Sequence, residues 1–432
     1  MNITQRLSLK WESVTQPILV SDSETVYFNQ IAQSKKNHLS EIQPGEVVAL
    51  IGDFDSQSIS DLLELINLKT IIVPLSPLTR HDHEYFFNSA QVQWVVENGE
   101  TSRRSSESRH ELLDYLRTEG KPGLVLFSTG TTGRPKAILH DFTKFLQRFE
   151  TARPTKKTIA FLLFDHIGGI NTLLHTLFNG GTIICTKDRS TKTILALCQK
   201  YQVEVLPTTP TFLRMLLISG AVPDEIPDSL EVITYGTERM DQGTLSTLNT
   251  LLPHIDFRQT FGMSELGILR VKSEARNSLF MKIGGEGVRW RTAPDNTLEI
   301  FSETRMLGYL NSESPFIEDG WYVTNDIVEV KGEYLRVVGR VGDTVNVGGL
   351  KFLLSEVELI ILQHPKVFLA SAYARNNPIT GQHVEVLVQS RSNSKLTNEE
   401  VSSFLAEKLP AHMQPRRIVV GQVEIGHRLK KL

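Results

Sequence analysis

The stretch that decides the fold is Leu124-Val-Leu-Phe-Ser-Thr-Gly-Thr-Thr-Gly-Arg-Pro-Lys136, a short apolar run that leads into a loop of hydroxyls and glycines and ends on a lysine. Its first four residues have the length and composition of a buried strand. The glycines permit backbone geometry and close approach that larger residues resist. Hydroxyl groups, backbone N–H groups and a lysine ammonium group suit phosphate oxygens. The pattern predicts a phosphate-binding loop, the alternative being an ordinary polar turn. We assign to this loop Ser128, Thr129, Gly130, Thr131, Thr132, Gly133 and Lys136.

This loop differs from the usual nucleotide P-loop, in which the lysine directly follows the second glycine and precedes Ser or Thr. Here Arg134 and Pro135 separate Gly133 from Lys136, and Ala137 follows. The difference argues against a conventional, kinase-like NTPase. The pattern Ser-Thr-Gly-Thr-Thr-Gly-x-Pro-Lys instead resembles the signature loop of the adenylate-forming (AMP-binding) superfamily, which contains acyl- and aryl-CoA ligases, adenylation domains of peptide synthetases, and luciferases.

The composition is that of an ordinary globular protein. Of 432 residues, 40% are hydrophobic and 22% charged, and the net charge of -3 leaves no footprint for nucleic acid binding. Cys185 and Cys198 are the only cysteines and lack disulfide or metal-ligand spacing, so we expect core thiols in a reducing compartment. Residues 1–11 contain no apolar signal core, and no apolar run reaches the length of a membrane span. We expect a cytoplasmic monomer or homodimer.

Hydrophobic runs alternate with helical patterns from Glu46 to Thr260, which predicts an α/β fold with parallel sheets covered by helices. Amphipathic spacing predicts a helix through Ile59, Leu62, Leu63 and Ile66, while the Ser- and Arg-rich residues 101–111 are expected to form a solvated loop. Further helices are expected over 193–200 and 211–218. The expected strands are 47–51, 70–75, 92–96, 124–127, 159–164, 182–185, 203–206, 232–235 and 257–260.

The alternation of predicted strands and helices ends in the last third of the sequence. Short strands and turns over 283–338 predict a β-rich subdomain, with strands at 298–301, 321–323, 327–330 and 334–338. Strands at 367–373 and 383–388 alternate with helices at 357–362 and 401–409, which is enough for a small α+β domain. Ser355 with Glu358, and Thr397 with Glu400, have capping-box spacing. These patterns predict a large domain followed by a small one, and the resemblance sets them at residues 1–341 and 342–432 and implies that the small domain is mobile.

Two glycine turns that follow predicted strands carry further motifs. Open α/β sheets bind ligands at the carboxyl ends of their strands. Thr234-Tyr-Gly-Thr-Glu238 ends one strand, and Gln259-Thr-Phe-Gly-Met-Ser-Glu265 follows another. The resemblance implies that the first turn packs the adenine ring and that Phe261 and Gly262 belong to the nucleotide site. It also implies that Ser264 contacts the α-phosphate and that Glu265 binds the Mg²⁺ that bridges ATP phosphates. The residues concerned are Gly236, Thr237, Glu238, Phe261, Gly262, Ser264 and Glu265.

The segment Gly320-Trp-Tyr-Val-Thr-Asn-Asp326 resembles the family's Thr-Gly-Asp segment, whose aspartate binds both ribose hydroxyls. Asn325 stands where the family has glycine, and because Asn tolerates positive φ, the backbone is expected to be kept. The resemblance implies a ribose contact from Asp326 and a second ribose or phosphate contact from Arg340. It also implies a hinge at Gly342, with the glycine-bearing segment around Gly349 facing the pantetheine of the acceptor thiol.

The acyl site is less sharply marked. Phe164-Asp-His-Ile-Gly-Gly169 resembles the family's His-x-Gly-Gly segment, in which the ring lies beside the acyl carboxylate and the glycines open space. We assign His166 and Gly169 to this site, the alternative for His166 being a core or surface histidine. Asp165 either meets a substrate amine or caps a helix that starts at Ile167.

The tail departs from the family, whose members carry a catalytic lysine in a Gly-Lys motif. The corresponding tail is Ile425-Gly-His-Arg-Leu-Lys-Lys-Leu432, so His427 occupies the lysine position. Arg428, Lys430 and Lys431 are candidate substitutes, and we select Arg428. Histidine is shorter than lysine and largely neutral at pH 7, so weak adenylation is one reading of this tail.

Together these motifs imply ATP-dependent activation of a small carboxylic acid as acyl-AMP and its transfer to the thiol of CoA or of a phosphopantetheine carrier protein, with Mg²⁺. One alternative is a member impaired in adenylation that runs mainly the thioester half-reaction. The other is a non-catalytic protein that binds nucleotide or acyl groups.

Overall fold

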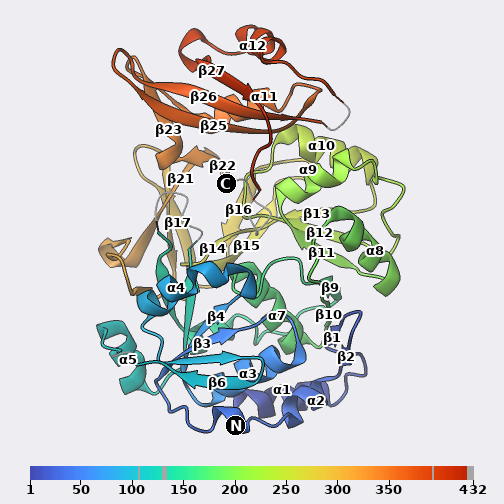
Figure 1. The fold of residues 1–432 in the computed structure, drawn as a ribbon, viewed down its shortest axis with the longest axis vertical. Helices are drawn as coiled ribbons and strands as arrows, with labels where there is room; N and C mark the ends of the chain where they lie inside the picture. Colours follow the sequence, from blue (N-terminus) through green and yellow to red (C-terminus); the bar gives the residue numbers. More distant parts are fainter. Residues whose placement is uncertain (106–107, 129–133, 392–393, 426–432) are drawn as a thin grey trace.

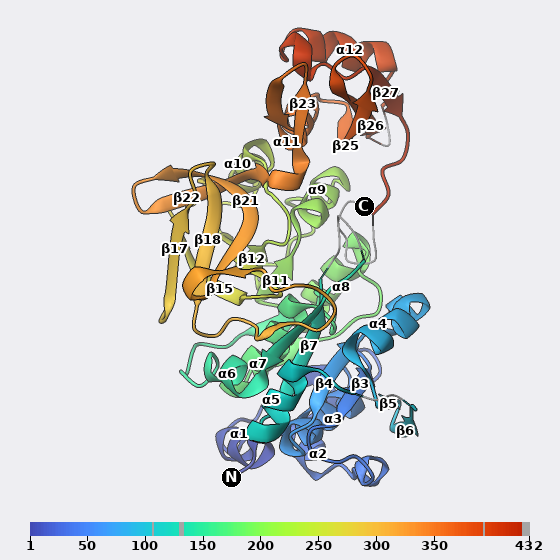
Figure 2. The same ribbon diagram turned by 90° about the vertical axis from the view of Figure 1, so that its left-hand side faces the viewer.

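The computed structural model describes residues 1–105, 108–128, 134–391 and 394–425, and Figures 1 and 2 show two views of them. Two α/β sheets occupy the end of the molecule that holds the N-terminus. The first runs in the order β19-β8-β7-β4-β3-β5-β6, with β7, β4, β3 and β5 parallel and the remaining pairs antiparallel. Its strands are β3 (Val47–Ile51), β4 (Ile71–Leu75), β5 (Trp94–Glu97), β6 (Glu100–Arg103), β7 (Gly123–Phe127), β8 (Ala137–Asp141) and β19 (Gly308–Tyr309).

The second α/β sheet runs in the order β13-β12-β11-β9-β10-β1-β2 and is parallel except for the pair β1–β2. Inner parallel strands bury both faces, and β10 and β12 are accordingly mostly buried, whereas the edge strand β13 is mostly polar. The strands are β1 (Leu19–Val20), β2 (Thr25–Val26), β9 (Lys157–Ile159), β10 (Thr182–Ile184), β11 (Val205–Thr208), β12 (Val232–Tyr235) and β13 (Asp256–Gln259).

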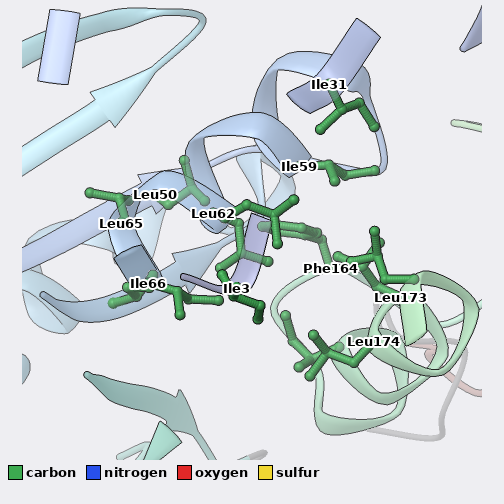
Figure 3. Close-up of a cluster of buried hydrophobic side chains, with 14 of the residues drawn as sticks. Ile3, Ile31, Leu50, Ile59, Leu62, Leu65, Ile66, Phe164, Leu173 and Leu174 are labelled. Carbon is green, nitrogen blue, oxygen red and sulfur yellow. The ribbon is translucent and has the colours of Figure 1, made fainter. Parts of the chain in front are cut away.

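Helices cover and join these two sheets. Figure 3 shows Ile59, Leu62 and Leu65 of α3 in one buried cluster with Leu173 and Leu174 of α7. Burying each such side chain contributes about 1.5–3 kcal/mol, so the cluster fixes the two sheets relative to each other. The helices of this part are α1 (Ile3–Trp11), α2 (Phe28–Gln33), α3 (Ser56–Asn67), α4 (His83–Ala90), α5 (Glu111–Glu119), α6 (Phe142–Gln147), α7 (Ile167–Asn179), α8 (Thr191–Tyr201), α9 (Pro210–Ile218) and α10 (Gln242–Leu251).

An antiparallel sheet, drawn in yellow and orange in Figure 1, lies beside the α/β sheets. It starts at Phe261, earlier than the predicted residue 283, because β14 and β15 form a hairpin directly after the last parallel strand. Its strands are β14 (Phe261–Met263), β15 (Gly267–Ser273), β16 (Met281–Gly284), β17 (Val288–Thr292), β18 (Thr297–Ser302), β20 (Phe316–Ile317), β21 (Trp321–Lys331) and β22 (Tyr334–Arg340).

A separate sheet with its own apolar core lies at the opposite end of the molecule from the N-terminus (Figure 1). Helices α11 (Leu354–Ile361) and α12 (Asn398–Ala406) belong to it, and the short turn Val341–Asp343 precedes it. The fold class is therefore the predicted one: α/β sheets, a β-rich part and a small α+β part. The strands of this last sheet are β23 (Thr344–Val347), β24 (Leu350–Leu353), β25 (Val367–Asn377), β26 (Gly381–Ser390) and β27 (Arg417–Val420).

Several local predictions were wrong. Residues 100–103 form β6, paired with β5, instead of a solvated loop. The two strands predicted within 321–330 are one strand, β21, whose register shifts at Ile327. Ser355 and Glu358 form no capping box, because the Ser355 hydroxyl donates to Val338 O and the Glu358 carboxylate accepts from Ala372 N. The second predicted box, Thr397 with Glu400, is present.

No helix within the described residues has both the length and the apolar character needed to cross a membrane.

Candidate active site

The described part of the phosphate loop is closed at its base. Ser128 N donates to Lys136 O at 3.1 Å, and Lys136 N donates to the Ser128 hydroxyl at 2.9 Å. Tyr85 and Asn311 both donate to the carbonyl of Pro135, at 2.8 and 3.2 Å. The loop joins β7 to β8, and these two strands pair antiparallel with Phe127 opposite Ala137. The loop residues Thr129, Gly130, Thr131, Thr132 and Gly133 lie outside the described residues.

Lys136 and Glu265 contact the same tyrosine, one at its ring and the other at its hydroxyl. The Lys136 ammonium nitrogen lies 4.7 Å from the centroid of the Tyr309 ring. The Tyr309 hydroxyl donates to Glu265 Oε1 at 2.9 Å. Burial, first, and the neighbouring Glu265 charge raise the pKa of Tyr309, so this hydroxyl keeps its proton at neutral pH. The same two causes raise the pKa of Tyr322, which stands beside Glu265 and Tyr309. The arrangement brings a cation and a carboxylate to the end of the phosphate loop.

The turn before Glu265 is tightly packed. Gly262 lies in β14, where an added Cβ would stand 2.7 Å from Gly267 O. Phe261 belongs to the apolar core of the β-rich part, so its ring packs against protein. The carbonyl of Ser264 accepts from His140 Nε2 at 2.6 Å. These contacts explain the glycine and the aromatic residue by packing; their nucleotide contacts stay predictions.

The predicted adenine turn lies at the carboxyl end of β12, beside the end of β13. Position 236 needs a glycine, because a Cβ there would stand 2.1 Å from the Thr260 hydroxyl. Thr237 adopts a positive φ of 71°, a strained value for a β-branched residue. The Glu238 carboxylate accepts from the backbone and the hydroxyl of Thr211, at 3.2 and 2.7 Å, so it holds the start of α9.

The predicted ribose site contains a buried carboxylate and an arginine. Asp326 and Arg340 are paired residues of β21 and β22, and Arg340 Nε donates to Asp326 Oδ1 at 2.8 Å. Burial raises the pKa of Asp326, against the opposing effect of Arg340. Asn325 has a φ of 59°, so the positive-φ backbone expected at this position is present.

The acyl segment differs from the helix-cap reading of Asp165. His166 is the N-cap of α7, and its Nδ1 accepts from Gly168 N at 3.0 Å. The helix-cap alternative for Asp165 was therefore wrong by one residue. Both side chains are buried, and Asp165 acts electrostatically on Asp53 and Arg189. Its meeting a substrate amine stays a prediction, as does the place of His166 beside an acyl carboxylate.

Gly169 is fixed by the approach of α7 to the preceding segment. A Cβ on Gly169 would stand 1.9 Å from Leu163 O. We expect Gly169→Ala to lower the free energy of unfolding by about 3 kcal/mol, since no side chain can move aside for a backbone clash. Urea unfolding measures this loss. Gly243→Ala in α10, where the Cβ meets Asp241 Oδ1 at 3.4 Å, is the matched control; equal stabilities of the two variants would contradict the packing argument.

The glycine segment of the small part forms an exposed turn between β23 and β24. Gly348 and Gly349 have φ of 61° and 90°, and an added Cβ on Gly349 would meet nothing within 4 Å. Gly342 lies in the turn between β22 and β23. Residues 421–425 run from β27 back toward the large part (Figure 2). His427, Arg428, Lys430 and Lys431 lie outside the described residues.

Sequence reasoning missed Tyr309 and His140. Tyr309 pairs with Ile138 through β19 and β8, residues 171 positions apart, and a lone tyrosine after a glycine gives no local signal. His140 is buried one strand after the loop. Its burial depends on contacts with distant residues and could not be predicted locally. Its position soon after the signature stretch is the one sequence signal that could have indicated it.

Comparison with known proteins decides the family. The family model described as AMP-binding enzyme matches residues 37–285, and the model described as AMP-binding enzyme C-terminal domain matches residues 356–424. The chain belongs to the AMP-binding enzyme family. The resemblance of the signature loop is thus confirmed, and Lys136, Gly236 and Glu265 all fall within the first matched range.

Curated relatives of this AMP-binding enzyme are distant. The chain is 23% identical over 338 residues to 4-coumarate--CoA ligase-like 6 of Arabidopsis thaliana, covering 68% of this chain and 58% of that protein. It is 26% identical over 318 residues to 2-succinylbenzoate--CoA ligase of Bacillus licheniformis, covering 68% and 64%. The chain thus spans about three fifths of the length of these relatives.

Solved structures show the same fold over nearly the whole chain. The anthranilate CoA ligase AuaEII in complex with anthranoyl-AMP has a TM-score of 0.82 at 16% identity, covering 100% of this chain and 95% of that one. The o-succinylbenzoate CoA synthetase (MenE) from Bacillus subtilis in complex with OSB-AMP has a TM-score of 0.76 at 17% identity, covering 100% and 96%.

The carboxylate present in this AMP-binding enzyme fits a magnesium ion that is held mainly by nucleotide. Such an ion takes one or two protein carboxylates and completes its octahedron with phosphates and waters. Within the described ranges, no group of three or more His, Cys, Asp or Glu side chains could hold a metal alone. Glu265 offers one carboxylate, oriented by the Tyr309 hydroxyl. This donor set suits a metal that arrives with ATP.

His140 makes the stability of the enzyme pH-dependent. Burial, opposed by its contact with Ser264, lowers the pKa of His140 from 6.5 to about 4. The unfolded chain therefore binds a proton that the folded imidazole resists. Stability is expected to fall by up to about 3 kcal/mol as the pH drops from about 6.5 to about 4. Urea unfolding at several pH values tests this; His140→Gln should lack this component, and an identical pH profile for the variant would contradict it.

Proposed function

We propose that this AMP-binding enzyme is an ATP-dependent acid:thiol ligase that activates a small carboxylic acid. The observation that carries the proposal is that Lys136 and Glu265 both contact Tyr309. A cation for phosphate oxygens and a carboxylate for a hard metal ion stand together at the end of the signature loop. The Asp326–Arg340 pair supplies a buried acceptor for ribose hydroxyls.

In the proposed reaction, a carboxylate oxygen of the acid attacks the α-phosphorus of ATP and the bond to the bridging oxygen of pyrophosphate breaks. A thiol, after losing its proton, then attacks the acyl carbon, and AMP leaves with its phosphate oxygen. Lys136 and the loop amides stabilise the charge that develops on the phosphates. A bound Mg²⁺, with Glu265 as its protein ligand, supplies charge neutralisation. Catalysis rests on positioning and electrostatics.

We propose that the small part, residues 342–432, acts as a lid that turns about Gly342. Its exposed Gly348–Gly349 turn would face the acceptor thiol in one pose, and its tail, with Arg428 as the selected cation, would reach the adenylation site in the other. An added Cβ on Gly349 would meet no atom of the described residues within 4 Å, so the turn has room for another group to approach it. The acceptor is CoA or a phosphopantetheine carrier protein.

Pyrophosphate exchange with a panel of carboxylic acids tests the first half-reaction. Exchange that depends on an acid and on Mg²⁺, with AMP released when CoA or a loaded carrier protein is added, is the expected result. Thioester formation from supplied acyl-AMP without exchange would favour the member impaired in adenylation, to which the His427 substitution points. ATP binding by calorimetry without AMP release for any acid and thiol would favour a non-catalytic binder, and release of ADP would overturn the class.

A further inference from the structure

A buried histidine contacts the backbone of the metal-site turn. His140 lies in β8, one residue before its end at Asp141, and is 1% exposed. Its Nε2 lies 2.6 Å from the carbonyl oxygen of Ser264, the residue before Glu265. A carbonyl oxygen only accepts, so Nε2 carries the proton and donates it. This hydrogen bond joins β8, the strand that follows the phosphate loop, to the backbone of the turn that carries Glu265.

A partly buried arginine contacts the same turn at Leu266. Arg148, just after α6, donates through Nη2 to Leu266 O at 2.5 Å and to Thr304 O at 2.8 Å. Its Nε donates to the Thr304 hydroxyl at 2.9 Å. Its Nη1 fills the space beside Gly267, where an added Cβ would stand 1.6 Å away. Burial lowers the pKa of Arg148 to about 10, which still leaves it charged at neutral pH.

These two contacts bracket Glu265. The carbonyl before it accepts from His140 and the carbonyl after it accepts from Arg148. The carbonyl of Glu265 itself accepts from Met306 N at 2.8 Å. The carbonyl groups of residues 264, 265 and 266 therefore all accept hydrogen bonds. The Glu265 side chain is oriented by the hydrogen bond that it accepts from the Tyr309 hydroxyl.

We propose that His140 and Arg148 are positioning residues that fix the backbone of residues 264–266 so that the Glu265 carboxylate is presented to the metal–nucleotide complex. Neither side chain touches the reacting atoms; both act through Glu265. The assignment rests on the proposed role of Glu265 in binding Mg²⁺. Losing the His140 contact would leave the partly buried Ser264 carbonyl without this donor and allow the turn to shift.

The test measures nucleotide binding by calorimetry, with the full chain, in Mg²⁺ and in EDTA. In His140→Ala we expect the tightening of ATP binding by Mg²⁺ to fall about tenfold, with metal-free ATP binding changed less than twofold, because the lost bond acts only through the metal ligand. His140→Gln, whose amide N–H can reach the same carbonyl, should recover most of the effect. Hydrogen exchange of residues 264–267 in the ligand-free protein should be faster in the Ala variant alone.

His83→Ala is the matched control. His83 is also buried, and its Nε2 meets Ser76 O at 3.0 Å, so this variant loses a comparable buried contact elsewhere. It should lose stability without changing the Mg²⁺ effect. Thr304→Val removes the hydroxyl acceptor of Arg148 in a milder way and should give a smaller shift in the same direction; it replaces His140→Ala if that variant does not fold.

The outcomes distinguish a failure of the positioning role from a failure of the proposed function. Equal Mg²⁺ effects in wild type, His140→Ala and Thr304→Val, or an equal loss in His83→Ala, would overturn the positioning role. If wild type itself shows no tightening of ATP binding by Mg²⁺, the proposed function fails first.

Discussion

Lys136→Ala is expected to lower acid-dependent pyrophosphate exchange by about 10²- to 10³-fold, the loss typical of removing one preorganised donor from a developing negative charge. Lys136 is exposed and its ammonium group contacts the face of Tyr309. An exposed contact of this kind contributes only about 0.5–1 kcal/mol to stability, so the variant should fold normally. The measurement is radiolabelled pyrophosphate exchange at saturating acid and ATP, with thermal unfolding as the check on folding.

Two further variants locate the effect. Lys136→Arg keeps the charge and the contact with the ring, and should recover part of the exchange rate, although the larger fork fits a different geometry. Tyr309→Phe keeps the ring face under Lys136 and removes the hydroxyl that donates to Glu265. It should raise the Mg²⁺ concentration needed for exchange by about tenfold, the usual worth of one hydrogen bond to a charged group. Exchange at the wild-type rate in Lys136→Ala would show that this loop does not hold the reacting phosphates.

The regular core of the fold could be predicted because its signals are local. Strands β3 and β12 begin and end where their apolar runs do, at 47–51 and 232–235. The two glycine turns were placed after predicted strands, and the structure has them after β12 and β13, which pair in parallel. Asn325 was recognised as a residue that keeps a left-handed backbone, and its φ is positive.

The remainder depends on contacts between distant residues. β6 is polar and exposed on most of its length, so it reads as a loop until β5 is available to pair with it. The cap of α7 is His166, one residue beyond the one selected, because an imidazole nitrogen here does what a carboxylate usually does. Glu358 has capping spacing, yet β25 supplies the N–H that its carboxylate accepts.

Tyr309, which contacts both Lys136 and Glu265 in the candidate site, could not be predicted from motifs alone. Tyr309 lies in β19, which pairs with β8 at the edge of the first α/β sheet, while its neighbours in sequence belong to the β-rich part. One short strand thus brings a residue from the β-rich part between the lysine of the signature loop and the glutamate of the next motif. The nucleotide contacts that the motifs suggest stay predictions, whereas the contact of Tyr309 with both Lys136 and Glu265 follows from the pairing of β19 with β8.

Asp326→Ala is expected to weaken ATP binding by about 100-fold, because two hydrogen bonds from ribose hydroxyls to a charged acceptor are lost together. The Asp326 side chain is 7% exposed, whereas that of Arg340 is 53% exposed. The arginine left behind can therefore reach water, and the penalty on folding should be small. Calorimetric titration with ATP and with a 2′,3′-dideoxy analogue measures the effect.

The comparison of the two nucleotides makes the ribose assignment specific. Wild type should bind the dideoxy analogue much more weakly than ATP, whereas Asp326→Ala should bind both equally weakly, since the group that distinguishes them is gone. Asn325→Gly, which accepts the same positive φ, is the matched control and should leave both affinities unchanged. If Asp326→Ala still prefers ATP to the analogue, the ribose hydroxyls are recognised elsewhere. The Asp326–Arg340 pair would then serve only to join β21 to β22 ahead of the turn at Gly342.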